Sequence, residues 1–572
     1  MPKYALGVDF GTESGRAVVV DVSDGRELAG VVHQYANGVI DERLPDGGPP
    51  LEPDWALQDP NDYLETLKRA VPEALRRSGV NPAEVIGLGI DFTACTMLPV
   101  LRDGRPLCSL PQFRNQPHAW VKLWKHHAAQ PEADRINAVA RRRKEKWLDL
   151  YGGKVSSEWF FSKALQILNE APELYAAADR LIEGGDWVVW QLTGRETRNS
   201  CTAGYKAIWQ KRGGFPRREY FRALHPGFAD IVDQKMSRDI LPLGAKAGEL
   251  TEQAAAWTGL KPGTAVAAAN VDAHVTIPAG QACAPGVMCM IMGTSICHMV
   301  NGTRLVRVPG MCGVVEDGMI PGCFGYEAGQ CGGGDVFAWF VEHAAPPEYH
   351  EAARRAGVNL HKHLENEAAR QKPGEHGLLA LDWWNGNRST LVDADTSGLL
   401  VGATLATRAP DIYRALIEAV AFGTREIIDG FQRHGVPVRT LVAGGGLPER
   451  NPLLMQIFAD VTEREIGLMR SPQACAVGAA IHGAVAAGPV AGGYADVFAA
   501  ARGMGGRKET VYRPNREHAK VYRLLYADYR RLYDCFGRGE NDVMKRLKAL
   551  RLSIRSNAAA LRLPKDRRKA GG

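Results

Sequence analysis

The sequence predicts an α/β protein built from two related halves that face each other across a cleft. The chain has 572 residues, more than one ordinary hydrophobic core uses, so two large domains or more are expected. Short apolar runs typical of buried strands alternate with stretches whose apolar residues recur at helical spacing. A strand, a Gly-Thr turn and a second strand occur at residues 4–21 and again at 286–300. Because this similarity is short, the duplication is a hypothesis.

The first of these hairpins carries features that suit a phosphate and a metal ion. Residues 5–8 and 17–20 form its strands, residues 11–15 form the turn, and Asp9 stands where the first strand ends. Glycines in such a turn let backbone N–H groups approach a phosphate closely. A carboxylate at the strand end is a ligand suited to Mg²⁺, directly or through water. A plain hairpin that starts a sheet is the alternative.

The second hairpin repeats the plan of the first. Its turn, Gly293-Thr294-Ser295, resembles the run Gly11-Thr12-Glu13-Ser14, and apolar strands flank it on both sides. If the two halves face each other, a nucleotide's phosphates lie between the two turns.

Polar residues follow two further predicted strands. Asp91 and two threonines, Thr93 and Thr96, follow the run 85–90, and they suit turn chemistry as well as a ligand site. Asp272 ends the strand at 264–272, where a carboxylate can take a proton from a bound hydroxyl. His274 is a second candidate base, although a single histidine beside Asp is more often structural.

Three more segments are candidates for ligand contact. Lys206 lies among aromatic residues, where a lysine is usually exposed but where a ligand role is also open. Glu327 precedes a glycine run and a helix. At Gly444–Gly446 a strand runs into bare backbone that lets a flat base lie against the chain, and a helix begins near Asn451. A plain strand–turn–helix is the alternative there.

Composition excludes several other classes of protein. Residues 541–572 hold ten basic and two acidic side chains, a local charge of +8, so the rest of the chain carries −2 of the total +6. No aromatics interleave the basic tail, which argues against nucleic-acid binding. No long apolar stretch and no apolar leader after Met1 occur, so we expect a cytoplasmic protein without membrane contact. The eleven scattered cysteines suit reduced thiols. P-loop, Rossmann and protein-kinase motifs are absent.

Taken in order, these motifs resemble the FGGY family of carbohydrate kinases over about residues 4–540. The segments that carry the resemblance are Val8–Arg16, Tyr151–Lys154, Asn270–Asp272, Met292–Ser295, Gly398–Arg425 and Ala443–Gly446. The resemblance implies two ribonuclease-H-like, actin-like ATPase domains facing an interdomain cleft. We expect an N-terminal domain at 1–282, a C-terminal domain at 283–540 and a basic tail at 541–572.

The resemblance also implies an activity, ATP- and Mg²⁺-dependent phosphorylation of a ketopentose, and a role for each candidate residue. Asp272 would be the catalytic base, and Asp9 would act through the metal. The sugar would contact Ala94, Lys206, Asp272 and Glu327. The phosphates would contact Gly11, Thr12, Glu13, Arg16, Gly293 and Thr294. Adenosine would lie near Gly445, Gly446 and Asn451.

Within the family, four stretches favour L-ribulose, an intermediate of L-arabinose catabolism, as the ketopentose. They are Asp91–Pro99, Lys154–Trp159, Ala203–Trp209 and Tyr326–Gln330. The alternatives are a family member for D-ribulose, D-xylulose, ribitol or glycerol, and a non-catalytic ATP-binding protein of the actin or chaperone type. For the ketopentose kinase, a homodimer is one possible assembly.

Overall fold

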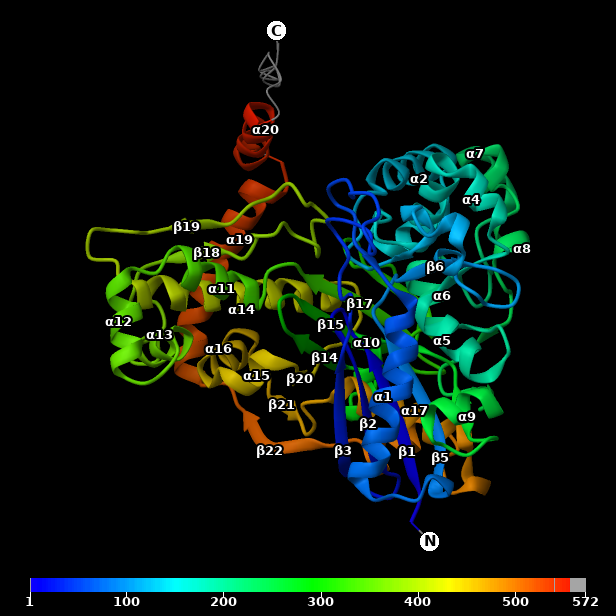
Figure 1. The fold of residues 1–572 in the computed structure, drawn as a ribbon. Helices are drawn as coiled ribbons and strands as arrows, with labels where there is room; N and C mark the ends of the chain where they lie inside the picture. Colours follow the sequence, from blue (N-terminus) through cyan, green and yellow to red (C-terminus); the bar gives the residue numbers. More distant parts are fainter. Residues whose placement is uncertain (1, 540, 556–572) are drawn as a thin grey trace.

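The structure is a computed structural model that describes residues 2–539 and 541–555 (Figure 1). Two seven-stranded sheets of the same plan organise it. The first sheet has the order β11 (Lys246–Glu249), β12 (Ala265–Ala267), β5 (Val85–Phe92), β1 (Tyr4–Phe10), β2 (Ser14–Asp21) and β3 (Glu27–Gln34), and β13 (Asn270–Val271) also pairs with β5. The second has the order β16 (Gly313–Glu316), β17 (Phe324–Gln330), β15 (Ile296–Gly302), β14 (Val287–Met292), β20 (Thr440–Gly444), β21 (Ile466–Met469) and β22 (Arg507–Tyr512).

The two predicted hairpins occupy equivalent places in the two sheets. In the first sheet β1 pairs antiparallel with β2 and parallel with β5. In the second sheet β14 pairs antiparallel with β15 and parallel with β20. The prediction of an α/β protein with two related halves is therefore confirmed.

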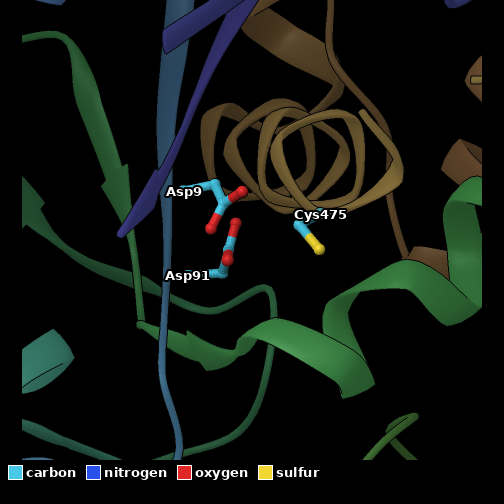
Figure 2. Close-up of side chains that lie close together, drawn as sticks. All are labelled: Asp9, Asp91 and Cys475. Atoms are coloured by element: carbon cyan, nitrogen blue, oxygen red, sulfur yellow. The ribbon is translucent and has the colours of Figure 1, made fainter. Parts of the chain in front are cut away.

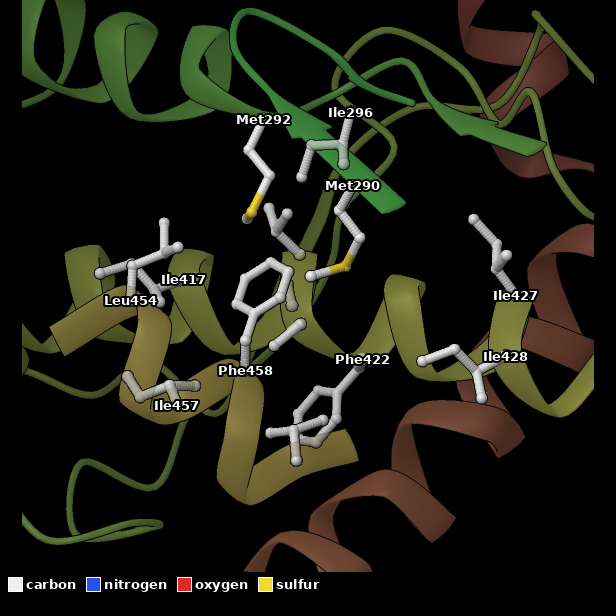
Figure 3. Packing of buried hydrophobic residues seen from close by; sticks show 14 of the residues in the cluster. Met290, Met292, Ile296, Ile417, Phe422, Ile427, Ile428, Leu454, Ile457 and Phe458 are labelled. Atoms are coloured by element: carbon white, nitrogen blue, oxygen red, sulfur yellow. The ribbon is translucent and has the colours of Figure 1, made fainter. Parts of the chain in front are cut away.

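Each sheet buries its outer face against helices. On the first sheet these are α1 (Pro60–Ser78), α5 (Gly184–Thr193) and α9 (Glu252–Thr258). The carboxylate of Asp59 caps α1 by accepting the Asn61 N–H, and Gly79 ends it in the left-handed region. On the second sheet Met290 and Met292 of β14 pack against α14 (Ala409–Arg433) and α16 (Pro452–Thr462), as Figure 3 shows. The helix α19 (Arg516–Gly537) joins that cluster.

Two helices fill the space between the sheets, and each comes from one half and touches the other. The helix α10 (Asp272–Ala279) follows the first sheet, but Thr276 contacts the thiol of Cys289 on β14 at 3.6 Å. The helix α17 (Ala474–Ala487) follows the second sheet and lies directly on the first. A Cβ added at Gly7 would lie 1.8 Å from the carbonyl oxygen of Ala476, and one at Gly89 would lie 1.8 Å from that of Ala479. These glycines therefore allow α17 to approach the strands at backbone distance.

A third, smaller layer belongs to the N-terminal half. Its four-stranded sheet contains β4 (Leu57–Gln58), β7 (Val121–Lys122), β6 (Met97–Val100) and β8 (Arg180–Glu183). A separate aromatic-rich core joins it to its helices. The remaining elements of this half are α2 (Gln130–Arg143), α3 (Phe160–Glu170), α4 (Pro172–Ala177), β9 (Arg198–Asn199), α6 (Ser200–Lys206), α7 (Arg218–Leu224), α8 (Ile231–Lys235) and β10 (Ile240–Leu241).

The C-terminal half adds short elements around its sheet. They are α11 (Gly334–His343), α12 (Pro347–Arg355), α13 (Leu360–Ala368), β18 (Leu379–Leu381), β19 (Leu399–Val401), α15 (Gly446–Arg450), α18 (Val497–Met504) and α20 (Val543–Arg555). The predicted basic tail begins as α20, which ion pairs from Lys545 to Asp393 and from Lys548 to Asp395 hold to the body. The rest of the tail, 556–572, lies outside the described residues. None of the described helices has the length and apolar character needed to cross a membrane.

Candidate active site

Two carboxylates meet at the ends of neighbouring strands of the first sheet. Asp9 on β1 lies directly opposite Asp91 on β5, and both are buried (Figure 2). Side chains alternate along a strand, so these residues share the inner face with the glycines that contact α17. Burial raises the pKa of Asp9, and the guanidinium of Arg16, 3.3 Å away, partly offsets it. Burial, followed by the charges of Asp9 and Asp272, raises the pKa of Asp91 well above its ordinary value.

This acid pair fits a hard divalent cation. No donor outside the acid pair reaches either carboxylate oxygen of Asp91, although the side chain is 0% exposed, and Asp9 can hydrogen-bond to it only through a shared proton. Unpartnered buried carboxylates are costly unless a cation or a proton satisfies them, and oxygen ligands are those that Mg²⁺ prefers. The sequence pattern predicts Asp9 as a metal ligand and leaves the role of Asp91 open between a ligand and a turn residue. A sequence feature that could have identified Asp91 as a ligand is the run Gly87-Leu-Gly-Ile-Asp91, in which two glycines and then an acid lie on one face of the strand.

The predicted base, Asp272, lies beside this pair. It is the first residue of α10 rather than the last of a strand, because β13 ends at Val271. Its carboxylate accepts the N–H of Ala273 at 2.6 Å and is partly exposed. Burial raises the pKa of Asp272 to about 7, while Asp9 adds to the rise and Lys206 opposes it. A carboxyl group with this pKa is suited to taking a proton near neutral pH.

A buried ion pair joins the two halves next to Asp272. Lys206, the last residue of α6, donates to Glu327 on β17 at 3.0 Å, and both side chains are buried. Burial by itself would lower the pKa of Lys206, but the charge and hydrogen bond of Glu327, together with the neighbouring thiols of Cys95 and Cys312, hold the pKa above its ordinary value. The lysine also lies 5.8 Å from the ring of Trp159. The two residues that the sequence could not place with certainty thus face each other across the halves.

His274 is placed as a supporting residue rather than as a base. Its Nδ1 lies 3.0 Å from the thiol of Cys201 and its Nε2 lies 3.7 Å from Glu327. Burial lowers the pKa of His274 to about 4, so the ring is neutral at pH 7. This favours Asp272 over His274 as the base.

Hydrogen bonds from a buried lysine and between two threonines fix the backbone of the loop around Ala94. Cys95, the next residue, has a positive φ of 64°. The ammonium group of Lys163, which is fully buried, donates to the carbonyl oxygens of Cys95 at 3.0 Å and Leu123 at 2.7 Å. The hydroxyls of Thr93 and Thr96 bond to each other at 2.7 Å. The threonines therefore serve the loop's structure, and Ala94 is presented on a fixed backbone.

The first Gly-Thr turn is closed by its own backbone. Gly11 N–H donates to the carbonyl oxygen of Ser14 at 3.0 Å. Trp124 donates through Nε1 to the hydroxyl of Thr12 at 3.0 Å, and Gln58 donates to the Thr12 carbonyl at 2.7 Å. Glu13, at the tip of the turn, is exposed.

The second turn has a different setting. Gly293 donates to the Ser295 carbonyl at 3.0 Å and accepts the Gly334 N–H at the start of α11 at 2.8 Å. Gly445 has φ +96°, and a Cβ added there would lie 2.6 Å from the carbonyl oxygen of Met292. The predicted adenosine segment is thus brought against the second hairpin. Asn451 caps α16 by accepting the Leu454 N–H at 2.9 Å, a structural task that sequence analysis did not foresee.

Comparison with known proteins agrees with this architecture. Residues 4–277 match the N-terminal domain, and residues 288–487 the C-terminal domain, of the FGGY family of carbohydrate kinases. Among solved structures, a xylulose kinase from Rhodospirillum rubrum has a TM-score of 0.76 at 22% identity, covering 93% of this chain and 98% of its own. A gluconate kinase from Lactobacillus acidophilus has a TM-score of 0.77 at 16% identity, covering 94% and 99%.

Curated relatives match over almost their whole length. "Ribulokinase" from Geobacillus thermodenitrificans is 56% identical, covering 98% of this chain and 99% of the relative. "Ribulokinase" from Anoxybacillus flavithermus is 58% identical, covering 96% and 97%.

Fold and site together define a two-domain carbohydrate kinase with the actin-like ATPase fold. The chain belongs to the FGGY family of carbohydrate kinases.

Proposed function

We propose that this chain transfers the γ-phosphate of ATP to the terminal hydroxyl of L-ribulose, forming L-ribulose 5-phosphate. The Lys206–Glu327 pair carries this proposal, because it sets two opposite charges from different halves beside the candidate base Asp272. Such a pair can hold sugar hydroxyls as donor and acceptor at once. The relatives at 56% and 58% identity that bear the name ribulokinase support the choice of sugar.

The chemistry follows from the roles that these groups can fill. Asp272 takes the proton of the sugar hydroxyl as its oxygen attacks the γ-phosphorus and the bond to the ADP oxygen breaks. Lys206 and Glu327, with the backbone at Ala94, align the sugar for in-line attack. Apart from the N–H groups of Gly11 and Gly293, which close the turns, the turns at Gly11–Thr12 and Gly293–Thr294 supply backbone N–H groups to the phosphates, with Arg16 and Glu13 nearby. Gly445, Gly446 and Asn451 lie toward the adenosine.

Asp9 and Asp91 are the residues that would hold Mg²⁺. Once bound, Mg²⁺ supplies neutralisation of the charge on the phosphate oxygens. Closure of the two halves on sugar and nucleotide would exclude water, which would otherwise hydrolyse ATP.

A panel of acceptors tests the proposal. ADP release by the full-length protein is measured with L-ribulose, D-ribulose, D-xylulose, ribitol and glycerol, and without acceptor. The highest kcat/KM is expected with L-ribulose. A higher value with another acceptor would show a family member of different specificity. ADP release that no acceptor changes would favour an ATP-switch protein of the actin or chaperone type.

A matched pair of lysine variants tests the sugar contacts. Lys206→Met removes the ammonium donor beside Glu327. Because a charged hydrogen bond to the sugar is lost, KM for L-ribulose should rise by about tenfold or more. Lys122→Met removes another fully buried lysine, whose Nζ contacts Gln166 at 3.1 Å and not Glu327. It should leave that KM near its wild-type value. Equal effects in both variants would reduce Lys206 to a structural role.

A further inference from the structure

The sulfur of Cys475 lies beside the acid pair, and the function proposed above does not use it. Cys475 is in the first turn of α17 and comes from the second half of the chain, whereas Asp9 and Asp91 end strands of the first (Figure 2). The three residues each offer one ligand atom, and these atoms all lie within 4.8 Å of one another. No other group of three or more Cys, His, Asp or Glu side chains with this spacing occurs in the described part of the chain.

We propose that Asp9, Asp91 and Cys475 form a site for a thiophilic divalent cation, Zn²⁺ above all, which excludes magnesium-bound nucleotide from the same place. Two observations carry it. The first is the convergence of two carboxylates and one thiol from three separate elements. The second is the state of Asp91, a fully buried side chain that no donor outside the acid pair reaches, and whose carboxylate points toward that of Asp9 in Figure 2.

The spacing suits zinc. Zinc binds thiolate sulfur at about 2.3 Å and carboxylate oxygen at about 2.0–2.2 Å, usually with four tetrahedral ligands. The three ligand atoms lie within 4.8 Å of one another, and side-chain rotations must bring them to those distances from a shared cation. The fourth position is then open to water. Three protein ligands and an open position are the usual donor count of a reactive zinc site.

The donor set discriminates between metals. Magnesium takes oxygen ligands and gains nothing from a thiol, so it would use Asp9 and Asp91 alone. Zinc and cadmium gain a thiolate bond in addition. On binding, the Cys475 S–H bond breaks, the proton leaves to solvent and the sulfur's electron pair forms the metal bond; no electron transfer is involved. Because the two metals share both carboxylates, each displaces the other.

The backbone explains why the thiol reaches the acids. Gly7, Gly87 and Gly89 allow α17 to lie on β1 and β5 without intervening side chains. Asp9 and Asp91 follow Gly7 and Gly89 by two residues, so they lie on the same face of the sheet as these glycines. The first turn of α17, which contains Cys475, therefore lies over the two acids. A bulkier strand would hold Cys475 away from both carboxylates.

The first measurement uses the full-length protein without nucleotide or sugar, so metal binding is tested independently of the proposed reaction; only the later competition with Mg²⁺ and ATP rests on the proposed function. Co²⁺ serves as a spectroscopic probe, because a cobalt–thiolate bond gives a charge-transfer band in the near ultraviolet. One Co²⁺ per chain with that band is expected, and Zn²⁺ should abolish the band. Absence of the band in the wild-type protein would overturn the proposal.

Three variants identify the ligands. Cys475→Ser should lose the band, and its affinity for Zn²⁺ should fall by at least about tenfold, the loss seen for weaker outer-shell changes. Asp91→Asn keeps the thiol and should also weaken Zn²⁺ binding. Cys297→Ser is the matched control, since Cys297 is a partly buried thiol whose pKa is raised by burial and, to a lesser degree, by Glu327. It should keep both the band and the affinity.

Two further outcomes would overturn the proposal. If Cys475→Ser, shown by circular dichroism to be folded, retained the band, the thiol would lie elsewhere. If an excess of Mg²⁺ with ATP left the band unchanged, the two metals would not share the carboxylates. Loss of the band on adding Mg²⁺ and ATP is the expected result.

Discussion

The two halves use the same backbone plan but place different side chains at one position. In the first sheet the parallel pair β1 and β5 sets Asp9 opposite Asp91. In the second sheet the equivalent pair β14 and β20 sets Ile291 opposite Gly444. In each pair, one residue lies two positions before a Gly-Thr turn, and the other lies near the end of the parallel neighbouring strand. One half therefore concentrates carboxyl groups where the other presents an aliphatic side chain and bare backbone.

This difference suggests how two halves with the same backbone plan can bind different groups. Buried acids are tolerated only where a cation or proton satisfies them, so they suit the half for which we propose the metal and the base. Bare backbone at glycine and an aliphatic surface suit a flat, uncharged nucleotide base. They therefore suit the half in which we propose the adenosine site. The site arises because α10 and α17 cross between the sheets, where a Cβ at Gly478 would lie 1.9 Å from the Val275 carbonyl oxygen.

The largest expected effect is at the proton acceptor. Asp272→Asn keeps the shape of the side chain but removes its capacity to take a proton. We expect kcat to fall by about 10²–10⁴-fold, the usual contribution of a positioned base. ATP affinity, measured by calorimetry on the same variant, should stay near its wild-type value. Turnover at the wild-type rate would show that the base lies elsewhere.

The acid pair itself gives the next largest effect. Asp91→Asn should raise the Mg²⁺ concentration needed for half-maximal activity by about 10–100-fold, as losses around a metal site do. Ile291→Val changes the equivalent strand end of the other half and should cost only about 0.5–1.5 kcal/mol of stability. Its Mg²⁺ requirement should not move. A shift in Ile291→Val as large as that in Asp91→Asn would break the comparison between the halves.

Two neighbouring glycines separate backbone strain from nucleotide contact. Gly445→Ala puts a side chain at φ +96° and against Met292, so it should lower Tm and raise KM for ATP by about tenfold. No atom lies within 4 Å of a Cβ added at Gly446. Gly446→Ala should therefore leave Tm unchanged and raise KM for ATP only if the base lies on that backbone. An unchanged KM would remove Gly446 from the adenosine site.

The last prediction concerns the pH profile of the unmodified protein. Burial raises the pKa of Asp272 to about 7, and the carboxyl can act as a base only when deprotonated. Kcat/KM should therefore increase with pH up to about 7 and level off above it, with a tenfold fall for each unit below. A profile that stays flat down to pH 5 would mean that the folded site holds Asp272 ionised.

Local pattern was sufficient for the strands, the turns and most of the helices. The runs at 5–8, 85–90 and 440–444 are short and apolar, and the turns contain the glycines that such bends require. The resemblance of the motifs to a family then assigned roles to Lys206 and Glu327, which local pattern had left open. Asp91 was not assigned, because an acid after a strand suits ordinary turn chemistry equally well.

What the sequence by itself determined is therefore the identity of each element, the repetition of the hairpin and the family to which the chain belongs. Only the tertiary structure decided that Asp9 faces Asp91, that Lys206 pairs with Glu327 across the halves, and that Cys475 joins the acids. The physical reason is the distance along the sequence over which each kind of interaction acts. Strand and turn preferences act between neighbouring residues, whereas these contacts join residues that are 82, 121 and more than 380 positions apart. Asp9 meets Asp91 through the pairing of β1 with β5, and Lys206 meets Glu327 where α6 and β17 of the two halves come together. Cys475 joins the acids because glycines let α17 lie on the first sheet.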